Sequence, residues 1–132
     1  MAESNKKVID EWILQSDYDF KTAEAMFDTG RYIYCIFMCH LSLEKCLKAL
    51  YCKALNKHPE KTHNLNYLIN KIGLELPEEL LSFIDNINNN SVPTRYPDDL
   101  QKVLASYKKR ETKKILSTTK ETLIWLKEKL QN

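Results

Sequence analysis

Glycine and proline are scarce in this chain, which has two glycines and four prolines in 132 residues. Because these two residues interrupt helices most strongly, their scarcity is typical of a helical protein. No stretch alternates apolar and polar residues for long enough to predict a strand. The composition therefore favours an all-α fold, and the length predicts a single domain over residues 1–132.

A strong charge imbalance and a long apolar run are also missing. The net charge is +2, which by itself is too small to indicate a nucleic-acid partner or an anionic membrane. The longest apolar run stops at His40, short of the roughly 18 residues that a membrane span needs. Residues 1–12 lack the apolar core of a signal peptide. We therefore expect a cytoplasmic protein that makes no membrane contact.

Cysteine is present only within one segment. Two cysteines on one straight helix are badly placed to bridge each other, and no other segment supplies a partner. Cys35 and Cys39 share a helix face, but no compact Cys/His signature accompanies them. We expect buried free thiols, no metal site and no cofactor; the four residues are Cys35, Cys39, Cys46 and Cys52.

That segment, residues 32–55, is predicted to be the central helix of a bundle. It contains no glycine or proline, and its first half is apolar on nearly every side. A helix of this kind is surrounded by other elements rather than lying on a surface. Its predicted seam has alternating four- and three-residue spacing and consists of Ile36, His40, Leu43, Leu47, Leu50 and Ala54.

The remaining chain predicts further helices around it. Residues 5–28 form one, and Gly30 ends it so closely before the next that the two make an antiparallel hairpin. A short helix over 63–72 has Thr62 as its N-cap. Another begins after Pro77 and dissolves in the asparagine-rich residues 86–91. The last helix either runs unbroken from Asp98 or breaks within 107–111. The fold class is an antiparallel helical bundle of three long and one or two short helices.

Two prolines frame the most promising functional side chain. Pro93 and Pro97 disfavour helix at the residues before them, which predicts stiff, extended backbone at Arg95 and Tyr96. The fork of Arg95 suits phosphate oxygens, and Tyr96 could stack on a base. The structural alternatives are that Arg95 pairs with an acidic neighbour and that Tyr96 covers the core.

A charged window interrupts the central helix. Glu44, Lys45 and Lys48 stand three and four residues apart and are predicted to share one polar stripe. The stripe could meet phosphates or a facing Arg95, or it could be an ordinary solvated face. We expect Arg95 to lie close to it, because the loop that carries Arg95 joins two helices that pack on the central one.

Other polar residues carry weaker signals. His63 could act as an acid or base near neutral pH, or it could form a cap or loop hydrogen bond. His58 is a loop residue without a predicted role. The cations at 108–110, 113 and 114 could track a nucleic-acid backbone or form a solvated face.

Several segments in order resemble the HEPN domain, a helical bundle found in prokaryotes and frequently encoded beside a minimal nucleotidyltransferase. They are AEAMFDTGRYIYCIFMCHLSLEKCLKALY, THNLNYL, TRYPDDL and ETLIWLKEKL, and the resemblance spans about residues 18–129. Its most specific parts are Glu44-Lys45 with Lys48, and Arg95-Tyr96-Pro97. The resemblance implies a nucleotide- or RNA-associated module that forms homodimers.

Many members of that family are ribonuclease toxins whose active site is an Arg and a later His with four to six residues between them. Here Leu100, Gln101 and Lys102 stand in that place after Arg95. The resemblance therefore favours a non-enzymatic module that binds nucleotide or RNA through Arg95, Tyr96, Glu44, Lys45, Lys48 and His63, or that serves a nucleotidyltransferase in a toxin–antitoxin-like pair. The alternatives are a metal-independent ribonuclease with an atypical active site and a structural adaptor.

Overall fold

The computed structural model of the protein describes the backbone of residues 2–95 and 100–131 and the side chains of residues 5–89 and 100–131. Within these ranges the chain forms six helices and no strand. The helices are α1 (Ala2–Asp28), α2 (Tyr32–Leu55), α3 (Leu65–Ile72), α4 (Glu78–Arg95), α5 (Leu100–Ser106) and α6 (Lys109–Leu130). No helix in the described part of the chain is long and apolar enough to cross a membrane.

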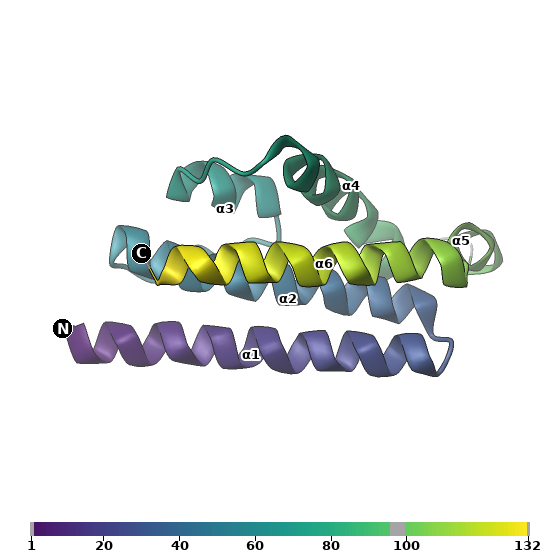
Figure 1. Ribbon diagram of the computed structural model, residues 1–132, viewed down its shortest axis with the longest axis horizontal. Coiled ribbons are helices and arrows are strands. Elements are labelled where there is room, and N and C mark those ends of the chain that lie inside the picture. Colours follow the sequence, from purple (N-terminus) through teal and green to yellow (C-terminus); the bar gives the residue numbers. More distant parts are fainter. Residues whose placement is uncertain (1, 96–99, 132) are drawn as a thin grey trace.

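The helices pack in layers, with α1 on one side, α3 and α4 on the other, and α2 and α6 between them (Figure 1). Helix α2 contacts each of the other five helices. The prediction that residues 32–55 form the central helix is therefore confirmed, with the same boundaries. Both chain ends lie at one end of the bundle, while the α1–α2 turn and α5 lie at the other (Figure 1).

The predicted seam of α2 is buried except at its last position. Ile36, His40, Leu43, Leu47 and Leu50 are all buried. Ala54 is exposed, and the neighbouring Leu55 packs against the core instead, so the prediction for Ala54 was wrong. The four cysteines are buried and free, as expected.

Two serines fix how α1 lies on α2. The hydroxyl of Ser16 donates to the carbonyl of Ser42 at 2.7 Å, and the hydroxyl of Ser42 donates to the carbonyl of Ser16 at 2.9 Å. Both residues are fully buried, so their small side chains let the two backbones come close. Gly30 makes the tight turn between the helices with a φ of 76°, a region that favours glycine.

Helix α4 corrects the prediction of a loop at residues 86–91. The helix continues through Pro93 to Arg95, so the backbone at Arg95 is helical rather than extended. Ile84 and Ile87 are buried in the core and hold this stretch against α2. The Asn88 side chain accepts from the Leu65 N–H at 3.0 Å, so it serves α3 instead of competing for its own backbone. Over the described residues the bundle thus has four long helices and two short ones.

The start of α3 differs from its prediction, and the break before α6 decides between the two alternatives for the last helix. The N-cap of α3 is Asn64, whose side chain accepts from the Tyr67 N–H, while the Thr62 hydroxyl accepts from the Asn64 N–H. Thr62 therefore shapes the preceding turn rather than capping the helix. At the C-terminal side the chain breaks between α5 and α6, at Tyr107 and Lys108, so the broken alternative for the last helix holds.

Candidate functional site

The charged window of α2 is a buried ion pair. Glu44 is 3% exposed and Lys48 is 7% exposed, and the Lys48 Nζ lies 3.1 Å from the Glu44 Oε2. Their i, i+4 spacing puts both on one face of α2, as predicted. Because both side chains are almost completely covered, the alternative of an ordinary solvated face is wrong for this pair.

His63 joins this pair from the loop before α3. Its Nδ1 lies 2.8 Å from the second carboxylate oxygen of Glu44, Oε1. An ionised carboxylate can only accept a hydrogen bond, so the Nδ1–H of His63 is the donor. The Nε2 of His63 is then the ring atom that can accept or donate a hydrogen bond elsewhere. The His63 side chain is 64% exposed, so this cluster of three residues reaches solvent through the imidazole. The loop hydrogen bond predicted for His63 is present and the cap is not, while its acid–base role stays a prediction.

Lys45 lies apart from this cluster. Its Nζ forms an ion pair of 2.7 Å with the Oδ2 of Asp19 on α1, and Asp19 is itself buried. The expectation that Lys45 shares one stripe with Glu44 and Lys48 is therefore corrected. Lys45 contributes to the α1–α2 interface, because its position on α2 is turned toward α1.

Trp12 on α1 extends the cluster on its other side. The Lys48 Nζ lies 5.5 Å from the centre of a Trp12 ring, within the range of a cation–π interaction. Burial raises the pKa of the neighbouring Cys52 thiol, and Trp12 partly offsets this effect. Together these contacts fix the indole against α2.

A groove opens beside Trp12. It has a volume of about 460 Å³ and is lined by Lys7, Val8, Glu11, Trp12, Gln15 and His58. The groove therefore combines an aromatic wall with two groups that can bear positive charge, Lys7 and His58, and one carboxylate, Glu11, which accepts from the Gln15 amide. A volume of this order is typical of small-molecule sites. Sequence reasoning missed this groove because His58 stands far from α1 in the chain. The spacing of Lys7, Glu11 and Gln15 on one α1 face was its only sequence signal.

The structure describes the backbone of one of the two residues between Pro93 and Pro97. Arg95 is the last residue of α4, but its side chain lies outside the described residues. Tyr96 lies outside them entirely. Their predicted approach to Glu44 and Lys48 stays a prediction.

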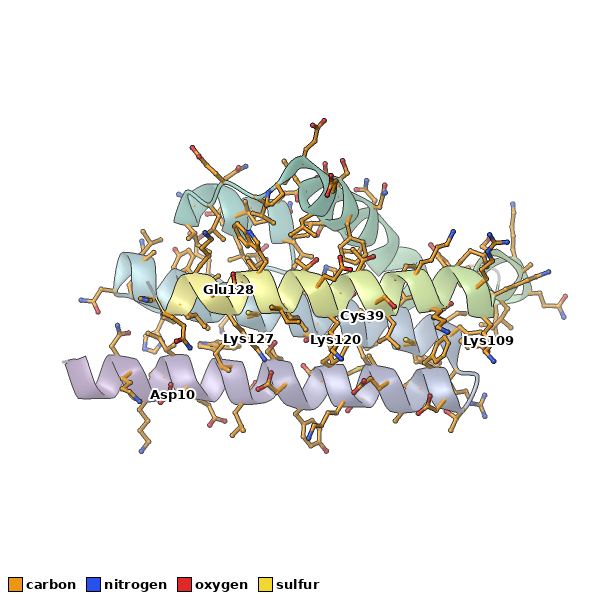
Figure 2. All side chains as sticks on the ribbon, in the orientation of Figure 1. Asp10, Cys39, Lys109, Lys120, Lys127 and Glu128 are labelled. Atoms are coloured by element: carbon orange, nitrogen blue, oxygen red, sulfur yellow. The ribbon has the colours of Figure 1, made fainter. Side chains whose placement is uncertain are left out.

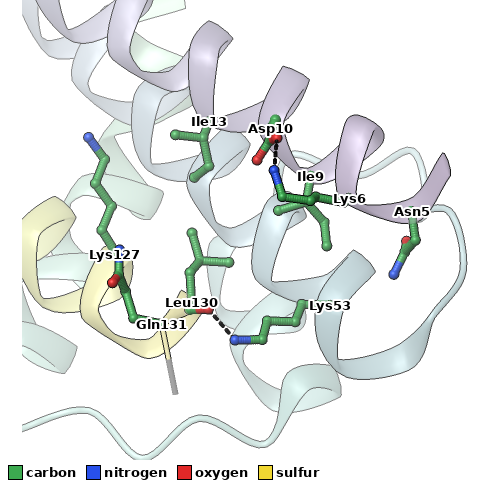
Figure 3. A pocket seen from close by; sticks show the side chains of 9 residues that line it. All are labelled: Asn5, Lys6, Ile9, Asp10, Ile13, Lys53, Lys127, Leu130 and Gln131. Carbon is green, nitrogen blue, oxygen red and sulfur yellow. Dashed lines mark hydrogen bonds and ion pairs between the residues drawn. The ribbon is translucent and has the colours of Figure 1, made fainter. Parts of the chain in front are cut away.

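A larger groove, of about 580 Å³, lies where the ends of α1, α2 and α6 meet (Figure 3). The cations that line it already have partners: Lys6 pairs with Asp10, Lys127 with Asp17, and Lys53 donates to the backbone carbonyl of Leu130. These contacts close the bundle at this end. They leave the groove poor in charge that a ligand could use.

The cysteines do not resemble catalytic nucleophiles. Burial raises the pKa of the Cys46 thiol to about 12. The pKa of Cys39 is raised well above its ordinary value, first by its hydrogen bond with Cys35 and then by burial. Thiols with these pKa values are neutral near pH 7, and the neutral form is a poor nucleophile. In the described part of the chain, no three His, Cys, Asp or Glu side chains are grouped as metal ligands.

Comparison with known protein families shows which family this helical bundle belongs to. The HEPN domain family profile matches residues 9–130. The chain belongs to the HEPN domain family. The resemblance of its sequence motifs to HEPN is therefore confirmed.

Two solved structures share the fold of this HEPN domain. TT1696 from Thermus thermophilus superposes with a TM-score of 0.78 at 21% identity, covering 92% of this chain and 97% of its own. ST0689, an archaeal HEPN homologue, superposes with a TM-score of 0.73 at 20% identity, covering 92% of this chain and 96% of its own. No curated protein sequence matches the chain. At these identities the likeness concerns the fold alone.

Proposed function

We propose that this HEPN domain is a non-enzymatic module that binds a nucleotide or the end of an RNA in the groove beside Trp12. The observation that carries the proposal is the combination of Trp12, Lys7 and His58 around one groove of about 460 Å³. An indole stacks on any nucleobase, and cations next to it attract phosphate. The ligand class is therefore one that has both a planar base and a phosphate.

The buried pair holds Trp12, the aromatic wall of the groove, in place. Lys48 contacts Trp12 on one side and Glu44 on the other, and Glu44 in turn holds His63. Four side chains from α1, α2 and the loop before α3 are thus joined in one row of contacts. A wall held in this way loses little conformational entropy when a ligand binds.

Arg95 and Tyr96 remain proposed ligand contacts from the sequence, but Arg95 ends α4, in the layer opposite α1, so neither is assigned to the groove beside Trp12. The guanidinium of Arg95 would supply a bidentate contact to phosphate, and the ring of Tyr96 a second stacking surface. Lys45 is engaged by Asp19, so we do not assign it to the ligand.

Trp12 itself offers the test. In a Trp125→Phe background, Trp12 is the only tryptophan, so its fluorescence reports on this groove. Titration with AMP should quench it saturably, because stacking of the base places adenine on the indole. Lys7→Ala should weaken AMP binding by about fivefold, the scale of one exposed charge contact. Lys6→Ala is the matched control, since Lys6 is paired with Asp10 and does not line this groove.

The outcome that contradicts the proposal is equally direct. Absence of saturable quenching at AMP concentrations up to about 10 mM would leave a free energy of binding weaker than roughly 3 kcal/mol, too weak for a nucleotide site. Equal loss of binding in the Lys6 and Lys7 variants would point to general charge attraction rather than to the groove.

One observation favours a second candidate, a metal-independent ribonuclease with an atypical active site. Glu44 orients His63 through Nδ1, and the other imidazole nitrogen can then transfer a proton. Against it, the chain lacks the family pattern of an Arg and a later His with four to six residues between them. The two candidates differ in whether RNA is bound only or also cleaved, which is measured with purified protein.

We also propose that the domain acts as a homodimer and as the partner of a minimal nucleotidyltransferase, in the cytoplasm. Tyr51 on α2 is buried within one chain and offers no surface to a second copy. The uncovered apolar residues on α1 are Leu14 and Tyr18, which are 64% and 74% exposed and lie one turn apart. Four free thiols suit a reducing compartment.

A further inference from the structure

Three large apolar side chains lie exposed together at the end of the bundle that carries the α1–α2 turn and α5. Tyr34, Leu100 and Leu104 are 55%, 54% and 48% exposed. They line a cavity of about 190 Å³, here called the α5 cavity, together with Gly30, Arg31, Tyr32 and Ile33. Small-molecule sites are usually larger, about 300–1,000 Å³, whereas roughly 150 Å³ is enough for a benzene ring. The α5 cavity therefore has the size for one large apolar side chain.

Helix α5 leaves its apolar face uncovered in the described part of the chain. It has seven residues, and none of them is buried. Leu100 and Leu104 are one turn apart, so they share the face that lines the cavity. A helix this short has little stability by itself and depends on packing of its apolar face. A further protein segment in the α5 cavity would supply that packing.

Arg31 gives the α5 cavity a preference for negative charge. Its side chain is exposed, and it forms no hydrogen bond or ion pair with the residues that the structure describes. It stands at the N-terminal end of α2, where a cation opposes the helix dipole. Lys109 lies at the same end of the bundle (Figure 2), which adds to the positive potential. Because a guanidinium binds a carboxylate bidentately, the fitting occupant has an apolar side chain beside a carboxylate.

The first turn of α4 presents a segment of this kind. Leu81 is 39% exposed, and Glu78, three residues earlier, neighbours it on one face of the helix. Glu79 is exposed as well. Over the described residues neither glutamate has a hydrogen bond or an ion pair through its side chain. We call Glu78, Glu79 and Leu81 the α4 acidic turn.

The α4 acidic turn lies away from the α5 cavity of its own chain. Helix α4 has 18 residues, roughly 27 Å, and leads from this turn toward the end of the bundle that carries α5 (Figure 1). Ile84 and Ile87 are buried in the core and hold the helix in this direction. The chain therefore displays two complementary surfaces that only different copies can bring together.

We propose that the α5 cavity of one copy receives Leu81 from the α4 acidic turn of a second copy, whose Glu78 pairs with Arg31 of the first. The two surfaces are different, so each copy can offer one and accept at the other. The inference rests on the proposed function only for the expectation that copies associate. It goes beyond that expectation by naming the surfaces that meet, and it is separate from the groove beside Trp12.

Sedimentation velocity at low salt over a range of protein concentrations tests this contact. Arg31→Glu, and separately Glu78→Lys/Glu79→Lys, should each weaken self-association about tenfold or more, because like charges then face each other. An equal mixture of these two variants should associate as the wild type does, since a cation again faces a carboxylate at both mixed contacts. Added salt should weaken the association of the wild type.

Matched controls separate the contact from general charge and apolar effects. Arg110→Glu makes the same charge change on an exposed arginine outside the cavity and should leave association unchanged. Leu81→Ser should weaken association, whereas Ile124→Ser, on a more exposed apolar residue of α6, should not. Far-UV circular dichroism checks that each variant keeps its helices.

The outcomes distinguish this contact from the proposed function. If copies associate but Arg31→Glu and Glu78→Lys/Glu79→Lys associate as the wild type does, the contact is overturned and the homodimer stands. Loss in each variant without recovery in the mixture would also overturn the pairing of these two surfaces. A wild type that stays a single chain would overturn both the contact and the homodimer, while the AMP titration would still decide the nucleotide site. A single chain that binds phosphatidylglycerol vesicles through Arg31 would assign the α5 cavity to an anionic membrane instead.

Discussion

Replacing Glu44 with glutamine should destabilise the fold by about 3 kcal/mol. The change keeps the size of the side chain but leaves the charge of Lys48 buried without a carboxylate. Glu44 and Lys48 are 3% and 7% exposed, with 3.1 Å between Nζ and Oε2. Breaking a buried pair by removing one partner costs roughly 3–5 kcal/mol. We take the lower end because the Trp12 ring, 5.5 Å from Nζ, still stabilises the ammonium group.

A double-mutant cycle separates the pair from the cost of burying its members. Lys48→Met alone should also destabilise, since Glu44 would then retain only His63. Glu44→Gln/Lys48→Met should recover most of the loss, because neither residue is left as an uncompensated charge. We expect a coupling energy of about 2 kcal/mol or more from urea unfolding followed by far-UV circular dichroism.

The matched control for this cycle is the exposed pair of Lys6 and Asp10, which has the same i, i+4 spacing. Asp10→Asn should cost less than about 0.5 kcal/mol, as usual for surface pairs. If Glu44→Gln costs no more than Asp10→Asn, the Glu44–Lys48 pair is solvated. The reasoning that treats it as the fixed wall of a site would then be wrong.

Four other predictions concern the site, the assembly and the core. Arg95→Ala should weaken nucleotide binding by roughly 1.5–3 kcal/mol in calorimetry, the range for a charged hydrogen bond, and unchanged affinity would remove Arg95 from the site. The domain should be a homodimer at micromolar concentration, and light scattering that gives the mass of one chain counts against this. Ribonuclease activity of purified protein should be weak or absent; cleavage of total RNA that is abolished by His63→Ala would instead promote the second candidate function. Above pH 9 the free energy of unfolding should fall by about 1.4 kcal/mol per pH unit for Cys46, because its thiol, with an ordinary pKa of 9.0, ionises in the unfolded chain while burial keeps the folded pKa at about 12. Urea unfolding at two alkaline pH values should show a shallower fall in Cys46→Ala, and an unchanged slope would mean that this thiol is not buried in solution.

Local sequence signals determined most of the helical framework. The run from Tyr32 to Leu55 has no helix breaker and is apolar on nearly every side, so its boundaries and its central place were readable from the chain alone. Gly30 ended its helix as predicted, because a left-handed residue at this place is a local requirement. The four cysteines were readable as free thiols for a similar reason: one helix cannot bring them together.

Local signals failed where a neighbouring helix decided the conformation. The asparagines of 86–91 favour a loop by themselves, yet Ile84, Ile87 and Asn88 are held by α2 and α3, so α4 continues to Arg95. Thr62 and Asn64 are both good caps in sequence, and only the three-dimensional turn decides which of them caps α3.

The candidate site shows the same division. The i, i+4 spacing of Glu44 and Lys48 was enough to place them on one face. Sequence could not tell that this face is covered, that Lys45 turns to Asp19, or that His63 reaches Glu44 from the next loop. The groove of Lys7, Trp12 and His58 forms only in the folded chain, because packing of α1 on α2 brings the loop after α2 beside the first turns of α1. Helix formation depends on neighbours a few residues apart, whereas burial and pairing depend on residues that only folding brings together.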